Sequence, residues 1–441
     1  MKIYLDTVGC RLNQAEIESY ARQFHAAGHT LVATPEEADL AVVNTCAVTS
    51  AAASDSRQKI RRVARAGAGE VVVTGCWSTL KPGEAAALRG VSRVVANAEK
   101  DRLVSDLLDL PPETFDLEPI ERELVPGARL RTRAFIKVQD GCDNRCTFCV
   151  TTLARGAGRS LPIPDILRDV RAAMNAEDGS AAREIVLTGV HLGSWGQDLS
   201  PSLRLKQLVQ AILDETKAPR LRLSSLEPWD LDEDFFALWQ EARLCRHLHL
   251  PLQSGSVATL RRMARKTTPQ SFARLVEAAR SAIPGVAITT DVIAGFPGES
   301  EAEFAETLDF VQAMHFAGGH VFTYSARQGT AAARMPHQVP YPLRKERNAQ
   351  LRQVLAESAR SYQSAFLGQV LPVLWESATA LGPQGWDMSG LTDNYLRVSA
   401  RLPRRLWNQI TPVRLTGRDD ETLYGKVLPA STPRSQTESF S

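Results

Sequence analysis

Three cysteines stand close together in the middle of the chain, at Cys142, Cys146 and Cys149, directly after the apolar run 134–139. Three thiolates at this spacing can bind one face of a metal ion or of an iron–sulfur cluster. A closed tetrahedral zinc site or a fully ligated cluster needs a fourth ligand, which this loop lacks. We therefore expect a centre with one open coordination position. A zinc site completed elsewhere and inert buried thiols are the alternatives.

A second set of cysteines is spread over residues 1–110, where a strand pattern ending near a cysteine recurs. The predicted strands are 3–7, 40–44 and 71–74, and helical patterns follow at 14–26, 51–66 and 81–88. This alternation predicts a doubly wound parallel sheet, in which the carboxyl ends of the strands share one edge. Cys10, Cys46 and Cys76 should therefore converge and hold an auxiliary cluster, although any one of them alone would more often be a small buried hydrophobe.

A second series of strand–helix units begins at residue 134. The predicted strands are 134–139, 184–188, 220–224, 247–250, 286–292 and 318–324. Six such units form an incomplete (β/α)6 barrel, and barrels carry their chemistry on the loops after the strands. Four of these loops are glycine-rich or polar, which suits a nucleoside and an amino-acid group because backbone amides can approach a ligand closely. His191 and Cys245 have ordinary structural interpretations and are not candidates.

After a predicted helix at 343–366, the chain changes to short runs typical of strands. These runs, at 370–376, 395–398, 411–415 and 423–427, predict a small antiparallel barrel. Basic and aromatic side chains alternate in it, and the RNA-binding candidates are Arg397, Arg401, Arg404, Arg405, Arg414 and Trp407. Such a surface can hold phosphates and stack bases. The alternative is a solvated face of a spacer domain.

Chain length, net charge and the number of cysteines limit these predictions. A chain of 441 residues has room for two to four domains, and the net charge of +2 means that any nucleic-acid contact depends on local patches. Seven cysteines spread this widely do not suggest a disulfide framework. No apolar run is long enough to span a bilayer, and the start of the chain is typical of a strand rather than of a signal peptide, so we expect a cytoplasmic protein.

Three motifs together closely resemble those of the radical S-adenosylmethionine (SAM) methylthiotransferases, over nearly all of residues 1–428. They are residues 7–14, the Cys142/Cys146/Cys149 loop with Phe148 and the following 154–156, and residues 248–255. The resemblance implies an α/β fold with an N-terminal methylthiotransferase domain (1–110), a linker (111–127), a radical SAM core (128–360), an all-β TRAM domain that binds RNA (361–428) and a disordered tail (429–441).

The resemblance also implies two 4Fe-4S clusters. Cys142, Cys146 and Cys149 would hold the cluster whose fourth iron binds SAM and which releases a 5′-deoxyadenosyl radical. Cys10, Cys46 and Cys76 would hold the auxiliary cluster that carries sulfur. Glu227 would face the substrate, and the residues implied to bind SAM are Thr188, Gly189, Ser225, Gln253, Ser254, Gly295 and Gly298.

Within the family, residues 9–14, 186–193 and 223–228 look most like the MtaB type. That branch inserts a methylthio group at carbon 2 of N6-threonylcarbamoyladenosine at position 37 of tRNA. The chain departs from the family pattern at 150–153 and 407–408, which affects fine contacts. Other substrates remain open, namely isopentenyladenosine in tRNA and a ribosomal-protein aspartate, and so does a non-catalytic RNA-binding protein with zinc. A reductant such as flavodoxin or ferredoxin is implied, and we expect a monomer.

Overall fold

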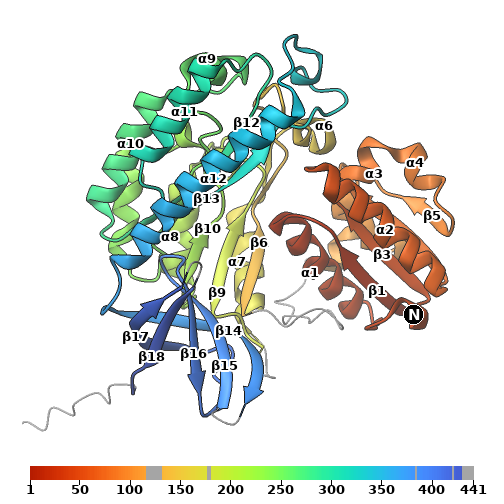
Figure 1. Ribbon diagram of the computed structural model, residues 1–441. Helices are drawn as coiled ribbons and strands as arrows, with labels where there is room; N and C mark the ends of the chain where they lie inside the picture. Colours follow the sequence, from red (N-terminus) through yellow and green to blue (C-terminus); the bar gives the residue numbers. More distant parts are fainter. Residues whose placement is uncertain (116–131, 176–179, 383–384, 420–421, 430–441) are drawn as a thin grey trace, which may run out of the picture.

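The computed structural model describes residues 1–115, 132–175, 180–382, 385–419 and 422–429. They form an N-terminal α/β domain, a central partial barrel and a C-terminal β-barrel (Figure 1). Most of the predicted linker and the predicted tail from 430 onward lie outside these residues, while Pro112–Phe115 forms the short 3-10 helix η3. Of the helices in the described chain, none is both long and apolar enough to cross a bilayer.

The N-terminal domain is a five-stranded parallel sheet in the order β2-β1-β3-β4-β5. The predicted strands are confirmed as β1 (Lys2–Thr7), β3 (Leu40–Thr45) and β4 (Glu70–Gly75). The short strands β2 (Thr30–Leu31) and β5 (Val91–Val94) were not predicted. Alternate residues of the buried strands face opposite sides, so that one core packs on α1 (Arg11–Ala26) and α5 (Leu103–Leu108) and the other on α2 (Ser50–Ala66). The sheet is therefore doubly wound, as predicted.

The predicted helix at 81–88 is shorter in the structure, where it is α4 (Pro82–Ala86), and a second short helix that was not predicted precedes it. Helix α3 (Cys76–Leu80) begins at the third cysteine, and α4 (Pro82–Ala86) follows directly. Proline is favoured in the first turn of a helix, where its missing N–H group leaves no hydrogen bond unmade.

The central domain contains the six predicted strands of a partial barrel. They are β6 (Arg133–Lys137), β9 (Glu184–Thr188), β10 (Leu221–Leu223), β11 (His247–His249), β12 (Ala287–Ala294) and β13 (Gly318–Thr323). Strands β6, β9 and β10 pair in parallel, as do β11, β12 and β13, and parallel bridges such as Ser225 to His249 join the two groups. The carboxyl ends of all six strands therefore share one rim.

Helices cover the outside of this barrel and bury its largest apolar core. They are α7 (Ile163–Met174), α8 (Leu205–Glu215), α10 (Pro269–Ala282), α11 (Glu301–Ala313) and α12 (Tyr341–Ser364). On the side of β6, α1 of the N-terminal domain lies against the barrel, where Ala15 packs with Phe135 and Val186. This contact places the N-terminal domain beside the first barrel strand (Figure 1).

The C-terminal domain is a closed barrel in the order β14-β15-β16-β18-β17. Its strands are β14 (Val370–Gly382), β15 (Gly385–Thr392), β16 (Arg397–Leu402), β17 (Ile410–Arg418) and β18 (Leu423–Val427). The barrel docks on the amino ends of the central strands, where Arg246 pairs with Asp393 at 2.6 Å and the His247 ring stacks on Tyr395 at 4.2 Å. It therefore lies at the end of the central domain opposite α6 (Thr151–Arg155), which follows the cysteine loop (Figure 1).

Candidate functional site

The central cysteine loop follows β6 and the short strand β7 (Gln139–Asp140) and folds back on the chain just after α6. Gly141 has φ 74°, and a β carbon there would stand 1.8 Å from the carbonyl oxygen of Ala157, so only glycine allows the close approach. The Cys142 N–H donates to the Gly156 carbonyl at 3.0 Å. This fold leaves the side chains of Cys142, Cys146 and Cys149 partly exposed.

Arg265 connects one of these cysteines to Glu227. Its Nη1 lies 3.7 Å from Cys146 Sγ, and its Nη2 lies 2.5 Å from Glu227 Oε2. The guanidinium also stacks over Trp229 with 4.4 Å to the ring centroid. Burial raises the pKa of the Cys146 thiol, and the Arg265 charge opposes this shift. Glu227 is therefore held beside the cysteine loop, although the sequence showed no partner for it.

His191, which was not a candidate, lies against the same loop. Its Nε2 is 2.6 Å from Asp230 Oδ2, and Asn144 approaches its Nδ1 at 3.3 Å. Burial disfavours the charged imidazolium, but hydrogen bonds to Asp230 and to Cys142 raise the pKa of His191 to about 10. The structure thus adds a buried histidine to the surroundings of Cys142.

The three N-terminal cysteines lie at the carboxyl ends of β1, β3 and β4, as predicted from the strand pattern. Gly9 has φ 110°, and a β carbon there would stand 2.6 Å from Cys46 Sγ, so the first two cysteine loops touch. Cys10 is exposed, whereas Cys46 and Cys76 are buried. Burial raises the pKa of the Cys46 thiol to about 11, so this thiol holds its proton at neutral pH until a metal displaces it.

Arg155, the last residue of α6, reaches from the central domain to the N-terminal cysteines. Its Nε lies 3.3 Å from Cys76 Sγ, and its Nη2 donates to Asn13 Oδ1 at 2.7 Å. From the N-terminal domain, Asn97 Nδ2 reaches back to the Ala154 carbonyl at 2.8 Å. Because the Cys142 N–H donates to the carbonyl of Gly156, the residue after Arg155, the central cysteine loop lies beside this contact between the domains.

Four buried charges surround this contact, and no more than 5% of any of their side chains is exposed. Arg155 Nη1 lies 2.9 Å from Glu16 and 2.8 Å from Asp140, and Lys100 Nζ lies 2.5 Å and 2.7 Å from the same two carboxylates. Burial alone would favour the neutral acids, but Arg155 and Lys100 lower the pKa of both Glu16 and Asp140. The network is therefore ionised and balanced, two charges of each sign.

Both sets of thiols suit iron–sulfur clusters. A cube-shaped cluster binds each cysteine through a different iron, so its thiolates need not point at one atom. Across the described residues, no three His, Cys, Asp or Glu side chains are arranged to hold a single metal ion. Each set offers three thiols and, among the described residues, no fourth protein thiol beside them, a donor set that fits a cluster with one open iron.

The residues predicted to bind SAM lie on the rim at the carboxyl ends of the strands, but they differ in exposure. Thr188 ends β9 with Gly189 after it, Ser225 is exposed after β10, and Gln253 has φ 72°. Ser254 is fully buried, and its hydroxyl pairs with Thr307 Oγ1 at 3.0 Å. Its side chain supports the loop from inside the protein.

The glycines after β12 have packing partners of their own. A β carbon at Gly295 would stand 2.1 Å from Cγ of Arg344 on α12, and the Gly295 N–H donates to Glu299 Oε1 at 3.0 Å. Gly298 has φ 75°, and its N–H donates to the His337 carbonyl at 2.8 Å. Close packing at Gly295 and the positive φ at Gly298 therefore explain why both positions are glycine.

The predicted RNA-binding residues lie on the C-terminal barrel, away from both sets of cysteines (Figure 1). Arg397, Arg404, Arg405 and Arg414 are exposed, and Arg405 stacks on the half-buried Trp407 with 5.7 Å to the ring centroid. Arg401 is exposed too, but it pairs with Asp387 at 2.6 Å. The structure gathers these residues on one domain but does not bring them to the cysteine rim.

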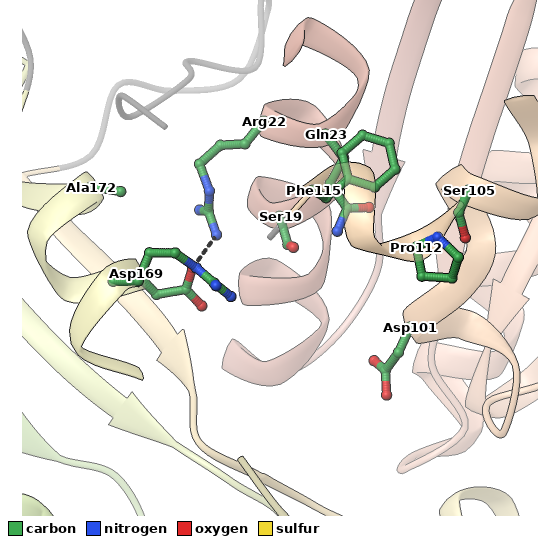
Figure 2. Close-up of a pocket in the computed structure, with 10 residues that line it drawn as sticks. Ser19, Arg22, Gln23, Asp101, Ser105, Pro112, Phe115, Asp169 and Ala172 are labelled. Carbon is green, nitrogen blue, oxygen red and sulfur yellow. Dashed lines mark hydrogen bonds and ion pairs between the residues drawn. The ribbon is translucent and has the colours of Figure 1, made fainter. Parts of the chain in front are cut away.

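A cavity of about 220 Å³ lies between the later turns of α1 and α7 (Figure 2). Arg22 of α1 pairs across it with Asp169 of α7 at 3.0 Å. None of the cysteines or other predicted site residues lines it. The cavity belongs to the contact between the domains rather than to the cysteine site.

Sequence reasoning missed Arg155, Glu16, Asp140, Lys100 and Arg265. Arg155 lies in residues 154–156, which belong to a motif of the family resemblance, and this motif could have marked it as a candidate. The sequence did not show what Arg155 contacts. The other four stand in ordinary helical or loop patterns, and their importance depends on burial that the sequence does not show.

Comparison with known proteins agrees with this architecture. Residues 2–96 match the uncharacterized protein family UPF0004, and residues 136–311 match the radical SAM superfamily. A solved structure of the radical SAM methyltransferase TsrM from Kitasatospora setae, with tryptophan and a SAM analogue bound, shares the fold at a TM-score of 0.57. The two sequences are 17% identical, and the likeness covers 75% of each chain.

Two curated relatives match nearly the whole chain. One, from Bacillus subtilis (strain 168), is named threonylcarbamoyladenosine tRNA methylthiotransferase MtaB and is 35% identical over 93% of this chain and 92% of its own length. The other, from Cereibacter sphaeroides (strain ATCC 17025 / ATH 2.4.3), is named tRNA-2-methylthio-N(6)-dimethylallyladenosine synthase and is 33% identical over 97% of this chain and 98% of its own length.

Proposed function

We propose that this chain, which belongs to the family of radical SAM methylthiotransferases, inserts a methylthio group at carbon 2 of N6-threonylcarbamoyladenosine at position 37 of tRNA. The observation that supports the proposal is the position of Arg155, which contacts Cys76 of the N-terminal set and Asp140, two residues before Cys142 of the central set. Methylthiolation needs both a radical source and a sulfur carrier, and two adjacent sets of thiols can supply one site for each. The relatives named MtaB support the choice of substrate.

In this proposal Cys142, Cys146 and Cys149 hold the 4Fe-4S cluster that binds SAM. When bound, that cluster supplies the electron that cleaves SAM and so provides the radical needed at an unactivated carbon–hydrogen bond. The second 4Fe-4S cluster is held by Cys10, Cys46 and Cys76 and presents the sulfur. A one-electron donor such as flavodoxin or ferredoxin serves the site, and the chain acts as a monomer.

The remaining roles are assigned by position on the rim. Thr188, Gly189, Ser225 and Gln253 contact SAM, while Ser254 and the glycines after β12 shape the loops behind them. Glu227, fixed by its pair with Arg265, faces the substrate. The exposed arginines of the C-terminal barrel bind the tRNA backbone, where cationic groups release counterions from phosphates.

A second candidate substrate is the isopentenyl-type adenosine of tRNA, because a relative of nearly equal identity is named for that reaction. Mass spectrometry of tRNA nucleosides separates the two substrates, with cells that lack the gene compared with cells in which it is restored. We expect the methylthio form of threonylcarbamoyladenosine to disappear and return. Loss of the isopentenyl derivative instead would keep the chemistry and change the substrate, and unchanged tRNA nucleosides would contradict the proposal.

Restoring the gene as Cys146→Ala or Cys46→Ala serves as the matched pair in the same experiment. Neither variant should restore the product. The purified Cys46→Ala protein should still cleave SAM, because its first cluster is intact, whereas Cys146→Ala should not.

A further inference from the structure

One arginine of the central domain contacts the cysteine set of the N-terminal domain. The Nε of Arg155 lies 3.3 Å from Cys76 Sγ. Its Nη2 donates to Asn13 Oδ1 at 2.7 Å, and Cys10 Sγ lies 3.6 Å from that same oxygen. A single guanidinium therefore reaches two of the three N-terminal cysteines, directly at Cys76 and through Asn13 at Cys10.

The other end of the Arg155 guanidinium contacts β7, the strand that leads into the cysteine loop of its own domain. Its Nη1 binds Asp140, which stands two residues before Cys142, and also Glu16 on α1, six residues after Cys10. The Arg155 side chain is 1% exposed, so water does not compete for these contacts. The planar guanidinium offers five N–H groups in a fixed geometry, and lysine cannot reproduce this set of simultaneous contacts.

Asn97 provides a second contact between the two domains beside Cys76. Its Nδ2 lies 3.7 Å from Cys76 Sγ and donates to the Ala154 carbonyl at 2.8 Å. The Cys76 sulfur thus has one donor from each domain, Arg155 from the central domain and Asn97 from its own. Donors to a cluster-binding sulfur, together with nearby positive charge, raise the reduction potential of the cluster.

We propose that Arg155 is a positioning residue that holds the two cysteine sets at a fixed separation and tunes the N-terminal cluster through its contact with the Cys76 sulfur. This inference rests on the proposed function, in which Cys10, Cys46 and Cys76 hold a cluster. Replacing Arg155 by a neutral residue removes one positive charge and one N–H donor from that sulfur. The reduced cluster, which carries the extra electron, then loses more stabilisation than the oxidised one.

The test isolates the N-terminal cluster. Replacing Cys142, Cys146 and Cys149 together by alanine leaves one cysteine set, and the midpoint potential of its cluster is measured by redox titration followed by electron paramagnetic resonance. Adding Arg155→Gln to this parent should move the potential to a more negative value. Arg155→Lys keeps the charge but loses the fixed donor geometry, so its shift should have the same sign and be smaller.

The matched control is Arg222→Gln in the same parent. Arg222 is also fully buried and paired, with Glu184 at 2.6 Å, but it lies where the C-terminal barrel docks. We expect this control to destabilise the fold and leave the potential unchanged. A shift of the midpoint potential of the same size in the control would mean that destabilisation of the fold alone changes the potential, and would overturn the inference.

The remaining outcomes separate the inference from the proposed function. If the parent protein binds no iron or sulfide, the second cluster is absent and both fail. If the cluster is present and Arg155→Gln leaves its potential unchanged, only the inference fails. If Arg155→Gln does not fold, Arg155→Lys is measured in its place. A midpoint potential of the Arg155→Lys protein equal to that of the parent would then overturn the inference.

Discussion

At the scale of single residues, Gly9 decides how closely two N-terminal cysteine loops can approach. Gly9 and Gly28 both have positive φ, but a β carbon at Gly9 would stand 2.5 Å from Cys46 Cβ, whereas Gly28 faces open space. Alanine at Gly28 should cost about 1–2 kcal/mol of stability from backbone strain alone, without loss of iron. Gly9→Ala should cost more and lower the iron and sulfide content by one cluster, measured by chemical analysis. Full iron content in Gly9→Ala would contradict this prediction.

Single residues also show what could and could not be predicted from the sequence. Cys10, Cys46 and Cys76 could be predicted to meet because cysteine is a rare residue and each one follows a recognisable strand. Arg155 could not be assigned, because arginine is usually exposed and its partner Glu16 comes from a distant part of the chain. The glycine at 295 was predicted to bind SAM and remains a candidate, and its packing against Arg344 could not be predicted from the sequence.

At the scale of elements, strands with an apolar sequence were predicted well. Strands that are polar or very short were missed. All six central strands follow runs that the sequence displays, and in five of them, all but β13, most residues are buried. Strand β15 was missed because residues 385–392 mix glycine, acidic and hydroxyl side chains, and only closure of the barrel pairs them on both edges. The two-residue β2 carries no periodic signal at all.

The loops that carry the cysteines should depend on the clusters for their order, whereas the strands behind them should not. Residues 142–146 have no regular secondary structure, while the strand residues 40–45 are buried and hydrogen-bonded on both sides. Removal of iron with a chelator should therefore speed amide hydrogen exchange in residues 46–49 and 141–150 and leave 40–45 unchanged. Mass spectrometry of peptides before and after chelation measures this difference. The turn at 393–396 is the control, and equal acceleration there would contradict the prediction.

At the scale of the whole molecule, the proposed chemistry and the proposed RNA contacts lie at opposite ends of the central barrel (Figure 1). The C-terminal barrel is fixed there by buried polar contacts, among them Arg220 with the Leu391 carbonyl at 3.0 Å and Arg222 with the Thr392 carbonyl at 3.1 Å. A tRNA that reaches both ends has to extend along the molecule. Binding and chemistry should then be separable by substitution.

The last prediction tests this separation with arginines on the C-terminal barrel. Arg404→Gln together with Arg405→Gln removes two exposed charges, and should weaken tRNA binding and reduce the slope of log affinity against log salt by about one to two. Arg401→Gln is the control, because Arg401 is already paired with Asp387 and should contribute less. Affinity is measured by filter binding at several salt concentrations, and SAM cleavage without tRNA should be the same in all variants. An unchanged salt slope in the double variant would show that RNA binds elsewhere, because removing a charge that binds a phosphate reduces the number of counterions released on binding.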